Sequence, residues 1–401
     1  MPASNTHSQY GSVAKTFHWL TALLILTAIP LGFFAEKAPF ADSEQLAFKA
    51  LLFSLHKTVG VAAFFTALLR IIWAMTQTRP GLLNSENRLE AFGAHTAHWL
   101  LYGSMLMVPL TGWIHHSATT GFAPIFWPFG QNLPFVPKNE ALSELFSGLH
   151  FIFIIVLVLS ILAHVGGALK HFVIDRDQTL QRMLPGRNSA PTPDPEAHSR
   201  LPQIAAVTTW ALALIIGGAA GILSTGAGHD RASNAPALAA APSEWVVQEG
   251  QVSISVVQFG SDVTGSFADW TAAIAFDETA TNGKHGEVEA TIAITSLTLG
   301  SVTDQALGGD FLDATGFPTA TFKADLLPAE NGYVASGTLT LKGASQPLDL
   351  PFSLELEGDT ARMSASTTLQ RLDFGIGATM PDESSLGFPV KVDITLTATR
   401  G

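Results

Sequence analysis

The sequence predicts a membrane protein in two parts, an all-α transmembrane bundle followed by an all-β antiparallel domain. The 401 residues are 47% hydrophobic and only 13% charged, whereas soluble domains carry about 25% charged residues. Residues 1–239 hold 14 Lys and Arg against 12 Asp and Glu, a net of +2, and residues 240–401 hold 7 against 21, a net of −14. This division excludes a single soluble globule. It also excludes the basic surface that a nucleic-acid-binding protein needs.

Five segments are apolar enough to cross a bilayer, which takes about 20 residues. Four of them contain no Lys, Arg, Asp or Glu, and the fifth, 50–75, contains Lys57 and Arg70. The first is interpreted as a helix rather than a signal peptide, because its apolar run is long and only weak cleavage sites follow it. The basic loops follow the second and fourth spans, which predicts a cytoplasmic N terminus. The four uncharged spans are 16–35, 91–116, 145–169 and 203–229.

The fifth span returns the chain, so the sequence predicts that its C-terminal part lies outside. From residue 244 apolar and polar residues alternate in short runs, separated by turn pairs such as Asn282-Gly283 and Asn331-Gly332. Many short strands predict an antiparallel sandwich or barrel, and a barrel can hold a lipid-like ligand. The predicted domains are a transmembrane domain 1–187, a cytoplasmic linker 188–202, the fifth transmembrane helix 203–229, a periplasmic tether 230–243 and a β domain 244–401.

Histidines inside predicted spans carry the main functional hypothesis, because ionisable groups are costly in lipid. His56 and His150 lie toward the outer ends of their spans, whereas His18 and His164 lie toward the inner ends. His150 and His164 are 14 residues apart in one span, about 21 Å along one helix face. Two imidazoles at one depth can hold a haem between them. The four histidines therefore predict an outer and an inner bis-His haem, an arrangement that favours electron transfer over oxygen binding.

Several alternatives stay open at this point. A histidine in a membrane often only hydrogen-bonds between helices, and zinc competes with haem iron for imidazole, although no carboxylate lies deep in these spans. His95 and His98 lie at the depth of His18 and are expected to replace an inner ligand or to contact a haem propionate or a quinone. Arg70 is expected either to contact a propionate or to extend to the inner interface. The absence of Cys excludes disulfides, iron–sulfur clusters and Cys-attached haem.

The residues around these histidines resemble the bacterial cytochrome b561 family over about residues 10–187. The resemblance implies a four-helix inner-membrane bundle with two b haems, whose ligands match His18, His56, His150 and His164. It also implies electron exchange with membrane quinone and, in some relatives, superoxide oxidation at the outer face coupled to ubiquinone reduction. The shared motifs are FHWL at 17–20, LHKTVG at 55–60, GAHTAHWLLY at 93–102, LHFIF at 149–153 and AHVGGALKHFVIDRDQTLQRMLP at 163–185.

The second half resembles the YceI family of periplasmic proteins over about residues 244–400. The resemblance implies an elongated lipocalin-like barrel that binds a polyisoprenoid chain. The family's R-D-x-H-L stretch is replaced here by TDQALGGDFLD, which weakens any shared polar contact at that place. The shared motifs are GDFLDATGFPTATFKADLL at 309–327, GYVASGTLTLKGASQPLDLPF at 332–352 and RLDFGIGATMP at 371–381. The expected liners of the barrel are Trp245, Phe267, Trp270, Phe276, Phe311, Phe317, Phe322 and Phe374.

The combined hypothesis is a quinone-linked, two-haem b-type cytochrome whose periplasmic barrel holds an isoprenoid or quinone tail. A second hypothesis is a membrane-anchored polyisoprenoid carrier with an accessory haem domain, and a third is a metal-ion channel or transporter. The expected partners are the lipid bilayer, a quinone or isoprenoid lipid and an electron donor that the sequence does not identify. The sequence is compatible with a homodimer, and no nucleic acid is expected.

Overall fold

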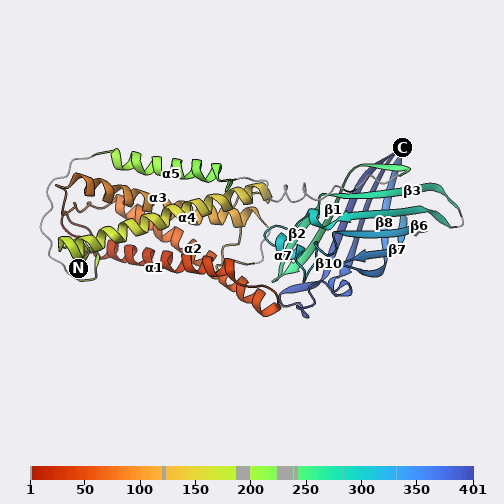
Figure 1. Cartoon of the computed structure of the whole chain (residues 1–401), viewed down its shortest axis with the longest axis horizontal. Coiled ribbons are helices and arrows are strands. Elements are labelled where there is room, and N and C mark those ends of the chain that lie inside the picture. Colours follow the sequence, from red (N-terminus) through yellow and green to blue (C-terminus); the bar gives the residue numbers. More distant parts are fainter. Residues whose placement is uncertain are drawn as a thin grey trace. The chain divides into compact units, whose positions relative to one another are not determined.

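A computed structural model of the chain describes residues 2–119, 123–186, 199–223, 238, 243–281, 283–330 and 332–401. Its contacts divide it into a helical unit and a β unit, with the main division near residue 225 (Figure 1). Residues 188–198 of the predicted linker lie outside the described residues. So does the predicted tether 230–243, apart from residues 238 and 243. Asn282 and Asn331 of the two predicted turns are also outside them.

The described residues form five long helices, four of which are apolar and long enough to cross a membrane. These four are α1, α2, α4 with its continuation to Asp175, and α5. Helix α3 falls short of that hydropathy because four histidines and three glycines interrupt its apolar sequence. It packs along α4 and also against α5. The bounds are α1 Ser12–Lys37, α2 Ser43–Met75, α3 Arg88–Ala118, α4 Glu140–Lys170 and α5 Leu201–Ala219.

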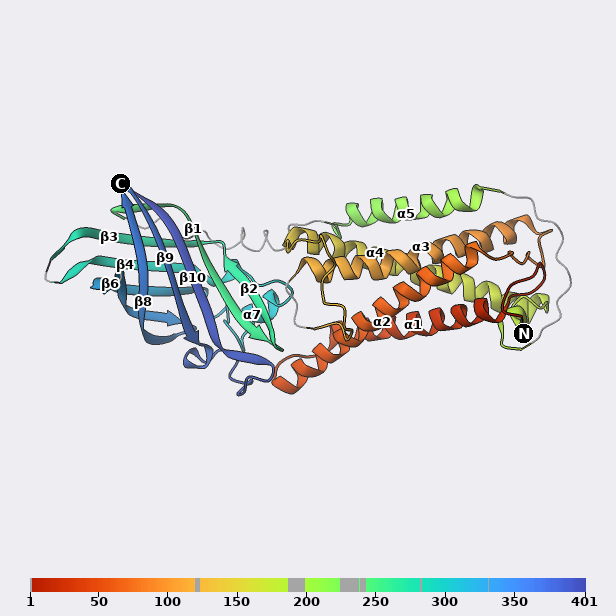
Figure 2. The same cartoon turned by 180° about the vertical axis from the view of Figure 1, so that it is seen from behind.

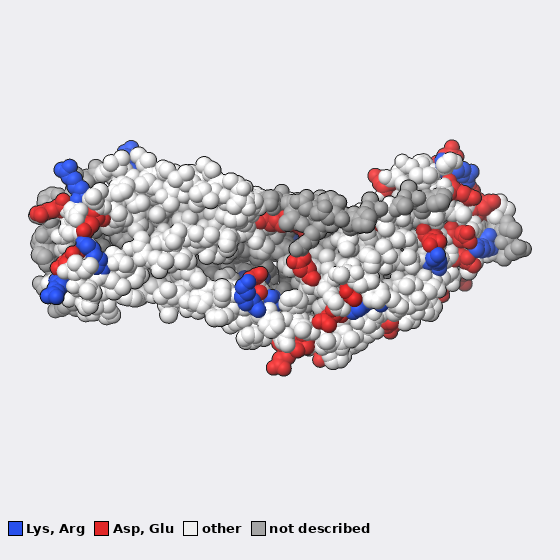
Figure 3. Space-filling view, viewed as in Figure 1, with Lys and Arg blue, Asp and Glu red and all other residues white. Residues whose placement is uncertain are grey.

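The outward faces of the four candidate spans are apolar rather than charged. Phe33 of α1 is 62% exposed and Ile216 of α5 is 66% exposed. In the helical part of Figure 3, charged residues gather toward the ends of the helices, and the surface between them carries none on the face shown. Exposed apolar surface of this extent marks contact with lipid rather than water. The helical unit therefore fits a membrane-embedded domain.

The segment after α4 is held against the start of α1. It continues as a π-helical turn, η1 (His171–Asp175), and a 3-10 turn, η2 (Gln181–Met183). The Lys15 ammonium donates to the Leu184 carbonyl at 2.8 Å, and the Trp19 indole donates to the Met183 carbonyl at 2.8 Å. These bonds hold the N-terminal end of α1, which carries His18, close to the chain that leaves α4.

The β unit is one curled antiparallel sheet of ten strands, a half-barrel (Figure 1, Figure 2). The strand order is β3-β4-β6-β7-β8-β9-β10-β1-β2-β5. The short helix α7 (Thr303–Leu307) and the 3-10 turns η3 (Ile294–Ser296) and η4 (Arg371–Phe374) connect strands. The strands are β1 Trp245–Gln258, β2 Ser261–Phe267, β3 Trp270–Thr281, β4 Lys284–Ala293, β5 Leu297–Thr298, β6 Thr319–Ala329, β7 Gly332–Leu341, β8 Ala344–Glu357, β9 Thr360–Gln370 and β10 Leu386–Arg400.

The alternating sequence explains why the sheet curls around an apolar interior. Along β8, Leu348, Leu350 and Phe352 face inward and the residues between them face out, as a period of two requires. Strand β1 carries register shifts near both ends in its pairing with β10, and such bulges bend and twist a strand. The β3 edge returns to the start of β1, where the Glu244 backbone N–H donates to the Ile274 carbonyl at 3.1 Å.

Candidate functional site

The outer histidines, His56 of α2 and His150 of α4, face one another inside the helical unit. Their ring centroids are 6.2 Å apart and the ring planes are nearly perpendicular. The Nδ1 atom of His56 lies 2.8 Å from the Ala28 carbonyl of α1, and that of His150 lies 2.8 Å from the Val108 carbonyl of α3. A carbonyl oxygen can only accept a hydrogen bond, so each Nδ1 must carry the proton and each Nε2 is left as the ligating nitrogen.

Two glycines support this arrangement in the same way on different helices. Gly32 follows Ala28 by four residues in α1, and Gly112 follows Val108 by four residues in α3. A side chain at position i+4 of a helix leans back over the carbonyl of residue i. A Cβ on Gly32 would lie 2.8 Å from the His56 ring, and one on Gly112 would lie 2.9 Å from the His150 ring. The glycines therefore leave both carbonyls accessible to the imidazoles.

The inner histidines, His18 of α1 and His164 of α4, form a second pair with ring centroids 6.1 Å apart. A third ring, His98 of α3, lies 5.2 Å from His164. The Arg70 guanidinium of α2 lies 3.3 Å from Nδ1 of His18 and stacks over the Tyr102 ring at 5.6 Å. The inner site thus has two imidazoles that could face His164, together with a cation beside one of them.

The distance between ring centroids in each pair can be compared with the distance expected for two imidazoles that hold one metal between them. Each ligating nitrogen would lie about 2.0 Å from the metal, so the two ring centroids would be roughly 6 Å apart. The structure has 6.2 Å for the outer pair and 6.1 Å for the inner pair. A Cβ on Gly60, one turn after His56, or on Gly166 or Gly167, just after His164, would meet nothing within 4 Å. These residues fit bis-His ligation of a haem with room beside the ligands.

The remaining histidines of α3 lie outside the two pairs. His95 is half-buried and lies on the same helix as His98, one turn earlier. At the opposite end of α3, Nδ1 of His115 lies 2.9 Å from the Ser143 carbonyl, and Nδ1 of His116 lies 3.2 Å from the Lys57 ammonium. These contacts link helices, which is the structural role that competes with ligation for any membrane histidine.

The half-barrel encloses an apolar cavity of about 290 Å³. Side chains from its strands, from α7 and from η4 line it. Phe317 is not among the lining residues; it is 38% exposed and packs against Gly343. A largely apolar cavity with a few polar groups is the usual form of a site for an apolar ligand. The other expected aromatic residues all line the cavity: Trp245, Phe267, Trp270, Phe276, Phe311, Phe322 and Phe374.

Comparison with known proteins identifies the helical unit. Residues 9–186 match the family model for prokaryotic cytochrome b561. Cytochrome b561 homolog 2 of Escherichia coli K12 is 30% identical over 192 residues, which are 47% of this chain and 98% of that protein. The chain belongs to the cytochrome b561 family. A second relative, called probable superoxide oxidase CybB of Yersinia pestis, is 25% identical over 183 residues, 45% of this chain and 97% of that protein. Haem binding and electron transport follow from the family.

The β unit of this cytochrome b561 relative is a YceI-like domain, matched over residues 245–398. A UPF0312 protein of Pseudomonas aeruginosa is 36% identical over 122 residues, 28% of this chain and 62% of that protein. Among solved structures, Burkholderia cenocepacia BcnA is similar at 28% identity and a TM-score of 0.36, covering 37% of this chain and 96% of that chain. Both family resemblances predicted from the sequence are confirmed.

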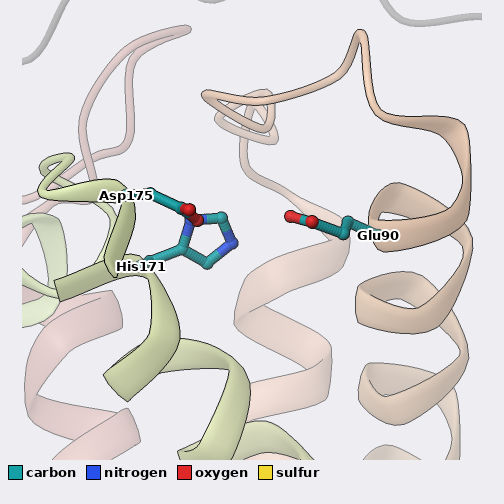
Figure 4. A group of neighbouring side chains, drawn as sticks. All are labelled: Glu90, His171 and Asp175. Carbon is teal, nitrogen blue, oxygen red and sulfur yellow. The ribbon is translucent and has the colours of Figure 1, made fainter. Parts of the chain in front are cut away.

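The cytochrome b561 domain also carries an ion-pair cluster where α3 begins and α4 ends (Figure 4). Glu90, His171 and Asp175 lie close enough to hold a metal, but the Lys170 ammonium lies 2.6 Å from Glu90 and 2.9 Å from Asp175. The single Lys170 ammonium already pairs with both carboxylates, so ion pairs between α3 and the end of α4 account for the cluster. Burial alone would raise the pKa of Asp177, yet hydrogen bonds from Thr179 and His171 hold it below its usual range.

Two groups of residues at these candidate sites were not predicted from the sequence. Gly32 and Gly112 matter only because a histidine of a neighbouring helix lies over each of them. In the sequence, a glycine inside an apolar span is only a weak sign of such a close approach. Gln258 and Gln305 line the half-barrel cavity. Only the inward-facing register of Gln258 in β1 and the placement of α7 reveal this.

Replacing Phe322 by alanine is expected to weaken lipid binding to the full chain roughly tenfold, because its buried ring lines the cavity. The matched variant Phe317→Ala removes an aromatic ring of the same size outside the cavity and should change binding less than twofold. Binding is measured by extraction and mass spectrometry of bound isoprenoid lipid. Equal losses in both variants would show that the cavity is not the binding site.

Proposed function

We propose that this protein is a five-span, two-haem b-type cytochrome of the bacterial inner membrane that transfers electrons between a periplasmic donor and membrane quinone. The observation that carries the proposal is the spacing of two histidine pairs. The ring centroids are 6.2 Å apart for His56 and His150 and 6.1 Å apart for His18 and His164. When bound, each haem supplies one-electron redox chemistry. If two histidines held each haem iron, no open iron position would remain, which would favour electron transfer over oxygen binding.

The chain's own residues supply the positioning that this function needs. The Ala28 and Val108 carbonyls orient the outer imidazoles and increase their basicity as ligands. At the inner pair, Arg70 offers a positive charge beside His18, suited to a haem propionate or to the oxygen of a quinone. His98 is the alternative inner ligand, and His95 remains a proposed propionate or quinone contact on the same helix. Helix α4 joins the two levels, with His150 and His164 about 21 Å apart along its axis.

The proposed topology follows from the basic loops and from α5. With α3 included as a span, five crossings would put the two ends of the chain on opposite sides of the membrane, and the basic loops favour a cytoplasmic N terminus and a periplasmic YceI-like domain. The hydropathy of α3 is low, but it packs against α4 and α5 and therefore needs less lipid-facing apolar surface. The half-barrel would then hold an isoprenoid tail close to the membrane, where tethering raises its effective concentration.

Superoxide is the proposed periplasmic donor, supported by the relative called probable superoxide oxidase. Two superoxide ions each lose one electron and leave as dioxygen, and one ubiquinone gains two electrons and two protons to become ubiquinol. A redox-titrated haem spectrum with haem counting, repeated with superoxide and with quinol, tests this function. Two haems per chain that superoxide reduces and ubiquinone reoxidises are expected, and a chain without a haem Soret band would contradict it.

A second candidate function is a membrane-anchored isoprenoid carrier whose haem domain is accessory. The apolar half-barrel cavity favours it, because such a cavity can bind a lipid without any electron transfer. Mass spectrometry of lipid extracted from the full chain separates the two functions. Bound quinone supports the redox function, whereas another polyprenyl lipid together with haems inert to quinone supports the carrier.

A further inference from the structure

The half-barrel cavity has a polar end inside an otherwise apolar lining. Among the described lining residues, the polar side chains other than tryptophan are Gln258, Gln305, Thr367 and Arg371. Gln258 lies at the end of β1 and is only 4% exposed. A buried amide within such a lining needs a hydrogen-bonding partner, because it has given up its bonds to water.

Both glutamines have one buried amide atom without a hydrogen-bond partner among the residues that the structure describes. The atoms are Oε1 of Gln258 and Nε2 of Gln305. One is an acceptor that lacks a donor, and the other is a donor that lacks an acceptor. A buried polar atom left unpaired destabilises the folded state, and a native structure that keeps two of them in one cavity calls for a reason.

These residues gather at one end of the half-barrel. Gln258 lies opposite Leu386 in the β1–β10 ladder, and the Leu386 carbonyl accepts from Arg371 at 3.1 Å. Gln305 belongs to α7, and the loop after α7 is joined to the segment after η4 by the Gly377 N–H, which donates to the Asp310 carbonyl at 2.8 Å. The α7 and η4 segments therefore bring Gln305, Arg371 and the end of β1 to the same end of the cavity.

The charges at this end do not suit an anion. Arg371 is the one charged side chain among the described lining residues. Its guanidinium already donates to five backbone carbonyls, those of Ile376, Gly377, Met380, Leu386 and Gly387. Asp382 and Glu383 follow in the same loop and add negative charge near Arg371. A phosphate here would lose its hydration without gaining new charged donors.

We propose that this end of the cavity binds the uncharged hydroxyl head group of an isoprenoid lipid, such as an alcohol, a phenol or a quinol. A hydroxyl donates one hydrogen bond and accepts another, which matches the free acceptor of Gln258 and the free donor of Gln305. The rest of the cavity takes the apolar chain. This inference rests on the proposed isoprenoid-binding function and specifies the head group that the cavity selects.

Competition among three probes of equal chain length tests the proposal on the delipidated full chain in detergent. The probes are geranylgeraniol, its methyl ether and geranylgeranyl diphosphate, and the bound fraction of each is measured by mass spectrometry after extraction. The wild-type chain is expected to retain at least about ten times more alcohol than ether or diphosphate. Gln258→Leu and Gln305→Leu should each reduce this preference about tenfold. The matched control Gln251→Leu, on the outward face of the same strand, should keep it.

Thermal unfolding of the ligand-free chain separates binding from folding. Gln258→Leu should leave the melting temperature unchanged or raise it, because it removes a buried amide whose Oε1 has no hydrogen-bond donor in the ligand-free chain. A preference for diphosphate, or a preference for alcohol that survives both substitutions, would overturn the proposal. A fall in melting temperature that accompanies the loss of binding would also overturn it, since the glutamine would then be structural. Retention of none of the three probes by the wild-type chain would instead contradict isoprenoid binding itself.

Discussion

His150→Ala is expected to remove one of two b haems and so to halve the haem content of the purified chain. The substitution takes away one imidazole of the outer pair and leaves His56 facing an empty position 6.2 Å away. The inner pair is about 21 Å further along α4 and should keep its ligands. Pyridine haemochrome counting and a redox titration should therefore find one haem and one redox transition in place of two.

The matched control is His115→Ala, a histidine at the same end of the bundle that hydrogen-bonds the Ser143 carbonyl and belongs to neither pair. That variant should keep both haems. Two haems in His150→Ala would contradict the assignment of the outer ligands. At the inner level, His18→Ala and His98→Ala decide which imidazole opposes His164, because only the true ligand should cost the inner haem.

Gly112→Ala is expected to weaken retention of the outer haem about tenfold, the scale at which groups behind a ligand affect metal affinity. Its Cβ would lie 2.9 Å from the His150 ring, so the ring has to move away from the Val108 carbonyl. Gly32→Ala should do the same to His56. The measurement is the rate at which haem is lost to an excess of a haem-free acceptor protein. The loss is followed by optical spectra that distinguish the outer haem from the inner one.

Gly93→Ala is the control on the same helix, because a Cβ at Gly93 meets nothing within 4 Å. In a helix, alanine in place of glycine normally stabilises by about 1 kcal/mol. Gly93→Ala should therefore keep both haems and unfold at the same or a higher temperature. If Gly112→Ala behaves like Gly93→Ala, the glycine does not position His150.

The two-part architecture could be predicted from the sequence because a helix that faces lipid and a strand with one face in water have different residue patterns. Long uncharged segments and period-two alternation are local properties, and both family resemblances rest on contiguous motifs. The hydropathy of α3 shows the limit of this reasoning, since its histidines and glycines take it below that of a typical span. A helix that packs against other helices needs less lipid-facing surface, and the sequence does not state which face is packed.

The aromatic residues of the half-barrel show a similar limit. Phe317 and Phe322 lie five residues apart in one motif, yet only Phe322 lines the cavity. Phe322 lies inside β6 with its side chain on the inward face, whereas Phe317 precedes the strand. Composition selects aromatic residues as candidates, but strand register decides which face each of them occupies.

The sequence by itself predicted a depth for each histidine, because depth follows from position within an apolar segment and from a fixed rise per residue. It also predicted that His150 and His164 share one face of their helix. Only the tertiary structure decided that His56 meets His150, that His98 approaches His164 and that carbonyls of α1 and α3 orient the outer pair. The physical reason is that these contacts join different helices, and helix packing depends on side chains far apart in the sequence.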